Sequence, residues 1–107
     1  MSGYTIYRHP EVENDLFQIL DLIEHYVGEA AAIRKLEQIE QTIQLLSQTP
    51  HMGSIRNELY RGLRAIPTAG KGVICFIVDD AQRSVYLICI AYAGSDWMSR
   101  IPKRTQE

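Results

Sequence analysis

Three cationic side chains, Arg61, Arg64 and Lys71, stand before and beside an apolar run that ends in Asp79-Asp80. Arginine and lysine bind phosphate and carboxylate oxygens, and arginine does so with two parallel hydrogen bonds. A nuclease that cleaves RNA through the RNA's own 2′-hydroxyl needs such cations beside a base and an acid. The three residues therefore predict a phosphate-binding edge, a docking edge for another protein, or ordinary surface charge.

Two aromatic residues near the end of the chain extend this set of candidates. Tyr92 is expected at the end of the last strand, directly before Ala93-Gly94. It is placed either to contact a ligand or to act as an amphipathic residue at the edge of the sheet. Trp97 is the only tryptophan. An exposed tryptophan is typical of an interface anchor, and the alternative is that it folds back onto the core.

The histidines and cysteines do not form a metal motif. His9, His25 and His51 are far apart, and no CxxC pair is present, so we expect no metal site and no cofactor. Cys75 and Cys89 both lie inside apolar runs. We expect them to be buried thiols that lie opposite each other across a hairpin, and not a disulfide.

Length and composition describe an ordinary globular chain. It has 107 residues, 46% of them hydrophobic, and a formal net charge of −2. This length fits one domain, and the charge argues against a dedicated nucleic-acid-binding protein. No apolar run approaches the ~18 residues of a transmembrane helix, and the start carries no signal-peptide pattern. We therefore expect a cytoplasmic location and no membrane contact.

Apolar periodicity predicts two helices after a short strand at 4–8. The first helix starts at about His9-Pro10-Glu11, carries apolar residues three and four positions apart, and stops at Gly28. The second runs from about 29 to 47 with the same spacing. Only a residue or two separates the helices, so they form an antiparallel hairpin.

Three further strands are predicted at 59–66, 73–78 and 85–92, the last two joined by a tight turn. The order β-α-α-β-β-β predicts an α+β fold. In it, the N-terminal strand and the helical hairpin pack on a small, mostly antiparallel sheet. We treat 1–107 as one domain, with a mobile basic tail from about 98 to 107.

The strands at 73–78 and 85–92 are apolar throughout and do not alternate with polar residues. Such strands are usually covered on both faces, but a helical hairpin covers only one. The sequence therefore predicts an exposed apolar face on the other side of the sheet, which is typical of a partner site.

A series of residues in a fixed order, over about residues 4–97, resembles one known family. These residues are Tyr4-x-Ile6, His9-Pro10, Asp15-Leu16, Ile19, Ile23, Tyr26, Leu46, Pro50, Gly53, Arg61-Gly62-Leu63-Arg64, Ile77-Val78-Asp79-Asp80 and Ile88-x-Ile90-x-Tyr92-x-Gly94-x-Asp96-Trp97. The pattern resembles the RelE/ParE toxin superfamily, the toxin halves of bacterial type II toxin–antitoxin pairs. The family fold is a small sheet with an N-terminal helical hairpin.

The resemblance implies one of two functions. RelE-like toxins enter the ribosome and cut mRNA without a metal, and here Arg61, Arg64, Lys71 and Tyr92 would form the catalytic set. ParE-like toxins lack that set and bind and poison DNA gyrase. In that case the same four residues would bind the target or the antitoxin, together with the pair Asp96-Trp97.

The departures from the RelE pattern favour the ParE branch. Val73 and Ser95 stand near positions where RelE-like toxins carry arginines. The end of this chain has no tyrosine-bearing helix in its sequence pattern, and the net charge is not basic.

As a ParE-like toxin, the chain is expected to arrest growth and to stabilise a plasmid. Its expected partners are a ParD-like antitoxin and gyrase, with contact to operator DNA only through the antitoxin. The acidic antitoxin would dock along Arg61, Arg64 and Lys71 and across the apolar sheet face. The chain also departs from the ParE pattern at Lys71-Gly72, Cys75-Phe76 and Ser95. A third hypothesis is therefore an inactive homologue that binds only the antitoxin.

Overall fold

The computed structural model of the chain describes residues 3–105. Its elements are β1 (Thr5–Arg8), α1 (Val12–Tyr26), α2 (Glu29–Gln48), β2 (Ser54–Ile55), β3 (Leu63–Thr68), β4 (Gly72–Asp79), β5 (Ser84–Tyr92) and α3 (Arg100–Thr105). The predicted α+β fold is confirmed, with β2 and α3 as additional elements. In the described part of the chain, no helix has both the length and the apolar composition needed to cross a membrane.

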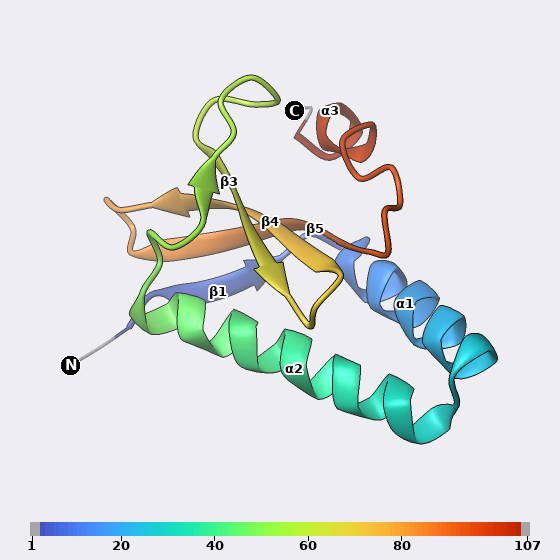
Figure 1. The fold of residues 1–107 in the computed structure, drawn as a ribbon. Coiled ribbons are helices and arrows are strands. Elements are labelled where there is room, and N and C mark those ends of the chain that lie inside the picture. The colour runs from blue at the N-terminus through green and yellow to red at the C-terminus, as the bar shows by residue number, and fades with distance from the viewer. Residues whose placement is uncertain (1–2, 106–107) are drawn as a thin grey trace.

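The five strands form one sheet in the order β1-β5-β4-β3-β2. β1 runs parallel to β5, and every other neighbouring pair is antiparallel, so the sheet is mostly antiparallel as predicted. Helices α1 and α2 cover one face, while α3 lies over the other (Figure 1). The sheet thus lies between two unequal helical layers.

The helical hairpin packs through one apolar stripe on each helix. Val12, Leu16, Ile19 and Ile23 of α1 are buried, as the periodicity predicted. Gly28, with a φ of 129°, makes the sharp reversal that places α2 against α1. The apolar spacing of α1 continues at Tyr26 or Val27, but the exposures of these two residues are 76% and 73%. They lie at the tip of the hairpin, which extends past the edge of the sheet (Figure 1).

The strand predicted at 59–66 starts later than its apolar residues suggest. β3 begins at Leu63 and not at residue 59, because Gly62 has a φ of 85°, which is incompatible with a continuous strand. The side-chain Oδ1 of Asn57 accepts a hydrogen bond from the Gly62 N–H at 2.8 Å. Residues 57–62 therefore form a turn that carries Arg61 away from the sheet.

The far face of the sheet carries a second hydrophobic cluster. Its buried members are Leu63, Ala65, Cys75, Ile88, Cys89 and Ile101. Ile101 belongs to α3 and is fully buried, and Trp97 packs against the same cluster. The segment predicted as a mobile tail carries a helix, α3, over Arg100–Thr105. The prediction of a bare far face is wrong, because α3 and the segment before it cover much of that face. Residues 106–107 lie outside the described residues.

The two cysteines occupy directly opposite positions on β4 and β5, as predicted from the hairpin. Both are buried free thiols. Burial is the main cause that raises the pKa of each thiol, followed by the neighbouring Cys89 for Cys75 and by the Asp15 carboxylate for Cys89. Both side chains therefore act as small apolar groups in the second cluster.

Candidate functional site

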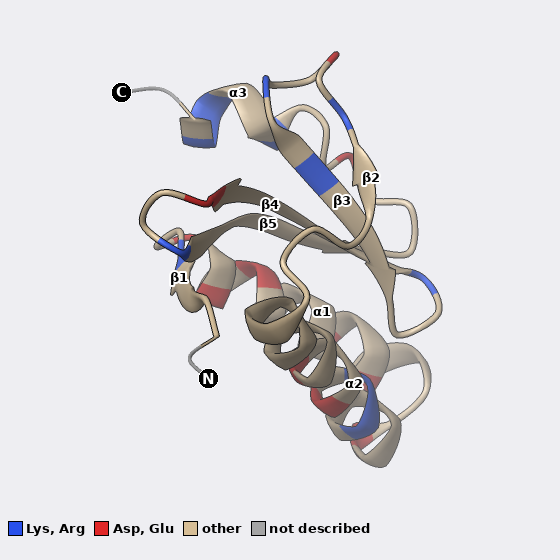
Figure 2. Cartoon of the chain, turned by 90° about the vertical axis from the view of Figure 1, so that its left-hand side faces the viewer, with Lys and Arg blue, Asp and Glu red and all other residues tan. Residues whose placement is uncertain are grey.

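The cations singled out in the sequence do not come together in the fold. Arg64 lies near the start of β3, and Lys71 lies in the turn after that strand. The four steps along the strand from Arg64 to Thr68 alone span about 13 Å at roughly 3.3 Å per residue. Arg61 is in the exposed turn before β3. Figure 2 shows cationic positions spread over β3, α3, the turns and α2, while acidic positions lie along α1 and α2, at the end of β4 and in the turn before β3.

Hydrogen bonds near the two ends of α2 show that Arg64 and Lys71 lie far apart. Lys35, in the second turn of α2, donates a hydrogen bond from Nζ to the Ala69 carbonyl at 3.2 Å, beside Lys71. Arg64 instead donates from Nη1 to the carbonyl of His51 at 2.9 Å, and His51 follows the end of α2. Lys71 and Arg64 thus lie near opposite ends of a 20-residue helix.

Tyr92 lies at the same end of the sheet as Lys71. Its Cα pairs with that of Gly72, and its ring packs partly buried against the core beneath the helical hairpin. Lys71 and Tyr92 line the same hollow, together with the exposed Tyr26 at the hairpin tip. The structure therefore brings together only two of the four residues that a RelE-like catalytic set would use.

Trp97 folds back onto the sheet, and Asp96 beside it stays exposed. The Arg56 guanidinium lies 5.4 Å from the centre of the Trp97 ring, which is a cation–π contact. The Asp96 carbonyl accepts a hydrogen bond from the Ser99 hydroxyl at 3.1 Å, which helps to turn the chain towards α3. Of the two alternatives for Trp97, the structure has the one in which it covers the core.

Asp80 is the centre of a polar cluster that the sequence analysis did not assign to a site. The Tyr4 hydroxyl donates a hydrogen bond to Asp80 Oδ1 at 2.7 Å, and His51 Nε2 lies 2.9 Å from the same oxygen and 3.1 Å from Oδ2. The hydrogen bond from Tyr4 is the main cause that lowers the pKa of Asp80, followed by that from His51. The same bond raises the pKa of Tyr4. This cluster joins the N-terminal segment, the loop after α2 and the β4–β5 turn.

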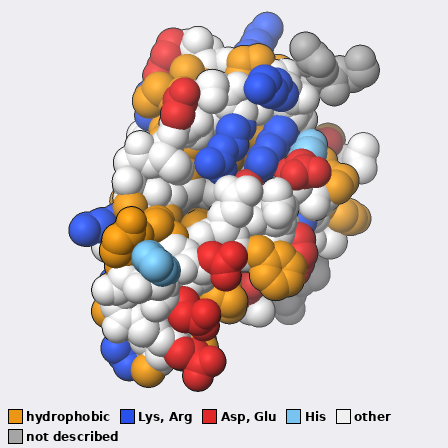
Figure 3. All heavy atoms as spheres, turned by 90° about the vertical axis from the view of Figure 1, so that its right-hand side faces the viewer, with side chains coloured by type: hydrophobic (Ala, Val, Ile, Leu, Met, Phe, Trp, Pro, Cys, Tyr) orange, Lys and Arg blue, Asp and Glu red, His pale blue; other side chains and the backbone are white. Residues whose placement is uncertain are grey.

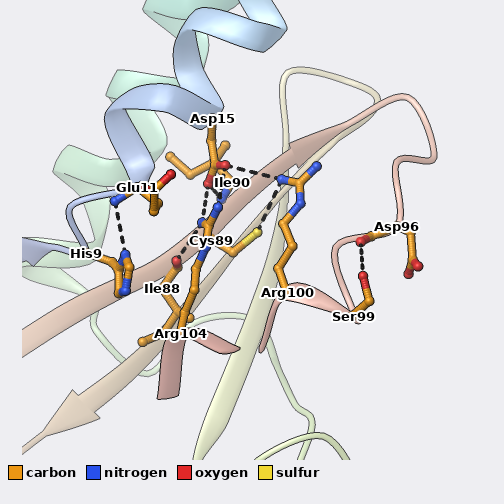
Figure 4. A network of polar contacts seen from close by, with 10 residues as sticks. All are labelled: His9, Glu11, Asp15, Ile88, Cys89, Ile90, Asp96, Ser99, Arg100 and Arg104. Atoms are coloured by element: carbon orange, nitrogen blue, oxygen red, sulfur yellow. Dashed lines mark hydrogen bonds and ion pairs between the residues drawn. The ribbon is translucent and has the colours of Figure 1, made fainter. Parts of the chain in front are cut away.

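Asp15 is the centre of a second and more buried network, which the sequence interpretation did not assign to a site (Figure 4). Its side chain is only 2% exposed. Arg104 makes two hydrogen bonds to the carboxylate, from Nη1 to Oδ2 at 2.6 Å and from Nη2 to Oδ1 at 2.9 Å. Arg100 Nη1 lies 3.3 Å from Oδ1. The bond to Asp15 raises the pKa of Arg104, and the network fixes α3 to α1.

The same network closes the open edge of β5. β1 pairs with β5 only as far as Leu87, and a bulge in the β4–β5 pairing places one extra residue, Ile88, in β5. The Ile88 carbonyl accepts a hydrogen bond from Arg104 Nη1 at 3.1 Å, and the Ile90 N–H donates to Asp15 Oδ2 at 3.0 Å. Side chains therefore replace a missing neighbouring strand and blunt an edge that would otherwise pair with another chain.

One sequence signal for Asp15 was available. It is three residues after Val12 and four before Ile19, so it lies on the buried face of α1. A charged residue on such a face is almost never left unpaired. Its partners, Arg100 and Arg104, are far away in sequence and lie in a segment whose composition suggested a tail. Only the structure identifies that pairing.

Of the four residues predicted as a catalytic set, only Lys71 and Tyr92 line the same hollow in the part of the chain that the structure describes. Within residues 3–105, no group of three or more His, Cys, Asp or Glu side chains is placed to hold a metal ion. What the fold does offer is a set of surface hollows along α1, where apolar and cationic side chains lie side by side. The arrangement is suited to binding a partner.

A protein-family model described as the ParE toxin of type II toxin–antitoxin systems, parDE, matches residues 6–97. The chain belongs to the ParE toxin family. It is therefore a toxin of a type II toxin–antitoxin system, and the resemblance noted in the sequence is confirmed. No curated protein sequence matches the chain.

Solved toxin structures share the fold of this ParE-family chain. A structure of the chromosomal ParDE system from P. aeruginosa matches with a TM-score of 0.72 and 17% identity, over 85% of this chain and 97% of that one. A mutant of the E. coli toxin RelE in the free state gives 0.65 and 12%, over 97% and 99%. The RelBE2 toxin–antitoxin complex from Mycobacterium tuberculosis gives 0.57 and 18%, over 89% and 97%. At these identities the likeness shows the fold alone.

Replacing the buried carboxylate, as Asp15→Asn, is expected to lower the free energy of unfolding by about 3–5 kcal/mol. The variant leaves two arginines without their counter-charge and weakens the contact to the Ile90 N–H. Urea denaturation measures the change. The matched control is Asp21→Asn, an exposed acid on the same helix, which should stay within about 0.5 kcal/mol of wild type. Equal effects of the two changes would contradict the role given to Asp15.

The Asp80 carboxyl is expected to titrate below its ordinary pKa of 3.8. Because its pKa is lowered in the folded state, its contacts stabilise the protein above the unfolded-state pKa, and this contribution is lost as the pH falls through the folded-state value. Carboxyl-carbon NMR gives the midpoint. Tyr4→Phe removes the largest cause and should raise the midpoint, whereas Tyr7→Phe should not. A wild-type midpoint at or above 3.8 would show that these contacts do not form.

Proposed function

We propose that this toxin inhibits DNA gyrase by binding it, and that a ParD-like antitoxin neutralises the toxin. Membership of the ParE family supports this, because the family model spans residues 6–97. On this proposal the toxin acts in the cytoplasm, where gyrase and its DNA are found. Arrest of growth and stabilisation of a plasmid would follow from blocked replication. Operator DNA would be contacted only through the antitoxin.

The observation that carries the proposal is the separation of the four residues of a RelE-like catalytic set. Ribonuclease chemistry needs a base, an acid and cations within hydrogen-bonding reach of one phosphate. Arg64 is bonded to the His51 carbonyl beyond the end of α2, whereas Lys71 and Tyr92 lie beside its start. Arg61 lies in an exposed turn outside both groups. The geometry favours a toxin that acts by contact over a ribonuclease.

The predicted contact residues do not all lie on one surface of the fold. Arg61, Arg64 and Lys71 do not form one continuous docking edge, because the length of β3 separates Lys71 from the other two. Asp96 and Trp97 lie on the far face, where Trp97 is partly covered. We therefore place the contact with the target at Lys71 and Tyr92, the two predicted residues that share a hollow.

Purified toxin is expected to block the supercoiling of relaxed plasmid by purified bacterial gyrase in the presence of ATP. Agarose gels measure the loss of supercoiled product as the toxin concentration rises. A matched control uses toxin unfolded in urea and diluted to the same final urea concentration as the folded sample. If folded toxin leaves supercoiling unchanged while it arrests growth when induced, the gyrase proposal is wrong. If it does neither, both toxin hypotheses fail and the inactive-homologue hypothesis remains.

A further inference from the structure

Two adjoining hollows form a groove along one side of α1. They have volumes of about 220 and 340 Å³ and share Leu22 and Tyr92 in their linings. Ile19, Leu22 and Tyr26 of α1 form one wall, and Ala91, Tyr92 and Ser95 form the other. We call this feature the α1–β5 groove. It follows β5 beyond the point where β1 stops pairing with it.

Large apolar side chains are exposed at one end of the α1–β5 groove. Tyr26 is 76% exposed, Val27 is 73% exposed and Leu22 is 38% exposed, and all three line the larger hollow. A contiguous exposed group of this kind marks an interaction site more often than scattered single residues do. Figure 3 shows a group of hydrophobic side chains on the face that contains the end of the hairpin, with cationic side chains elsewhere on the same face.

Hydrogen-bond donors at both ends of the groove have few acceptors. Lys71 is exposed and Lys35 lies beside it, while Arg100 lies at the other end. Every contact of Arg100 with the described residues uses Nη1, so its Nε and Nη2 have no partner among them. The only acidic residue in the lining is Asp15, and its oxygens are already bonded to Arg104, Arg100 and Ile90.

A buried hydroxyl in the wall of the groove also lacks a partner. Ser95 Oγ is shielded from solvent and makes no hydrogen bond to the described residues. Unpaired buried polar atoms are rare in folded proteins and call for an explanation. Together with the free donors of Arg100 and Lys71, this hydroxyl gives the groove the means to bind carboxylate or carbonyl oxygens between apolar contacts.

The length of the groove limits what can occupy it. From Gln18 to Val27, α1 covers about 13 Å at 1.5 Å per residue. This accommodates about four extended residues or two to three helical turns. An antitoxin segment that folds on binding wraps a large surface, whereas a groove of this length suits one projecting loop or helix end of an already folded protein.

We propose that the α1–β5 groove is where this toxin holds gyrase. It receives a short segment of the enzyme that carries an apolar side chain between two carboxylates. The apolar side chain packs against Leu22 and Tyr26, and the carboxylates reach Lys71 at one end and Arg100 at the other. This inference rests on the proposed function and names the surface that performs it.

Photo-crosslinking tests where gyrase lies on the toxin. The probe is toxin carrying p-benzoylphenylalanine in place of Tyr26, irradiated with purified bacterial gyrase bound to DNA. The matched control has the same substitution at Tyr7, which is 55% exposed on β1 and outside the groove. We expect an adduct with a gyrase subunit from position 26 and none from position 7. If both variants still inhibit gyrase and position 26 gives no adduct, or both positions give equal adducts, the inference is wrong.

Charge reversal tests the cationic end of the groove. Lys71→Glu is expected to raise the toxin concentration for half-inhibition of supercoiling by about tenfold or more, because it repels the partner's carboxylate. Arg61→Glu, an exposed cation outside the groove, should change it by less than about twofold, and urea denaturation confirms that both variants fold. Equal effects overturn the inference. Full gyrase inhibition by the Lys71 variant with lost neutralisation by the antitoxin would assign the groove to the antitoxin. A wild-type toxin that does not inhibit gyrase would instead refute the proposed function and the inference with it.

Discussion

The structure depends on one buried carboxylate, that of Asp15. A charge that is 2% exposed is tolerated only when it is paired and fully hydrogen-bonded. Arg104 supplies a bidentate pair, Arg100 a longer contact and Ile90 a backbone N–H. These partners come from β5 and α3, while Asp15 comes from α1. A single side chain thus fixes the helical hairpin, the edge of the sheet and the last helix relative to one another.

This network also determines which surfaces remain available. By holding α3 against the far face, it buries Ile101 and covers a second hydrophobic cluster that the helical hairpin cannot reach. By capping Ile88 and Ile90, it closes the edge of β5 to a further strand. Arg100 is only partly used in the network, so it keeps donors at one end of the α1–β5 groove. The surface left for binding therefore lies along α1 and at the hairpin tip, and not on the far face of the sheet, where α3 lies.

Local patterns in the sequence were sufficient to predict much of the fold. Apolar spacing gave both helices, and the apolar runs around the β4–β5 turn gave the hairpin and the opposition of Cys75 and Cys89. The apolar spacing was misleading at Tyr26, which is exposed because the tip of the hairpin extends past the sheet that buries the rest of the stripe.

The apolar pattern also missed α3. This helix has six residues and one buried side chain, Ile101, and it is held by an ion pair between Arg104 and Asp15, 89 positions away in sequence. The separation of the three cations was not predictable either. Arg61 and Lys71 are only ten positions apart in sequence, but the length of β3 lies between them.

The central functional claim is that this ParE-family toxin acts by contact and does not itself cut nucleic acid. The most direct test is to incubate it with gyrase, plasmid and ATP, stop the reaction with detergent, and treat half of each sample with protease. The account predicts linear DNA that appears only when gyrase is present, with gyrase protein covalently attached until the protease removes it. Nucleic acid cut by the toxin alone, or ribosome-bound mRNA cut in its presence, would contradict the account and return the ribonuclease hypothesis to first place.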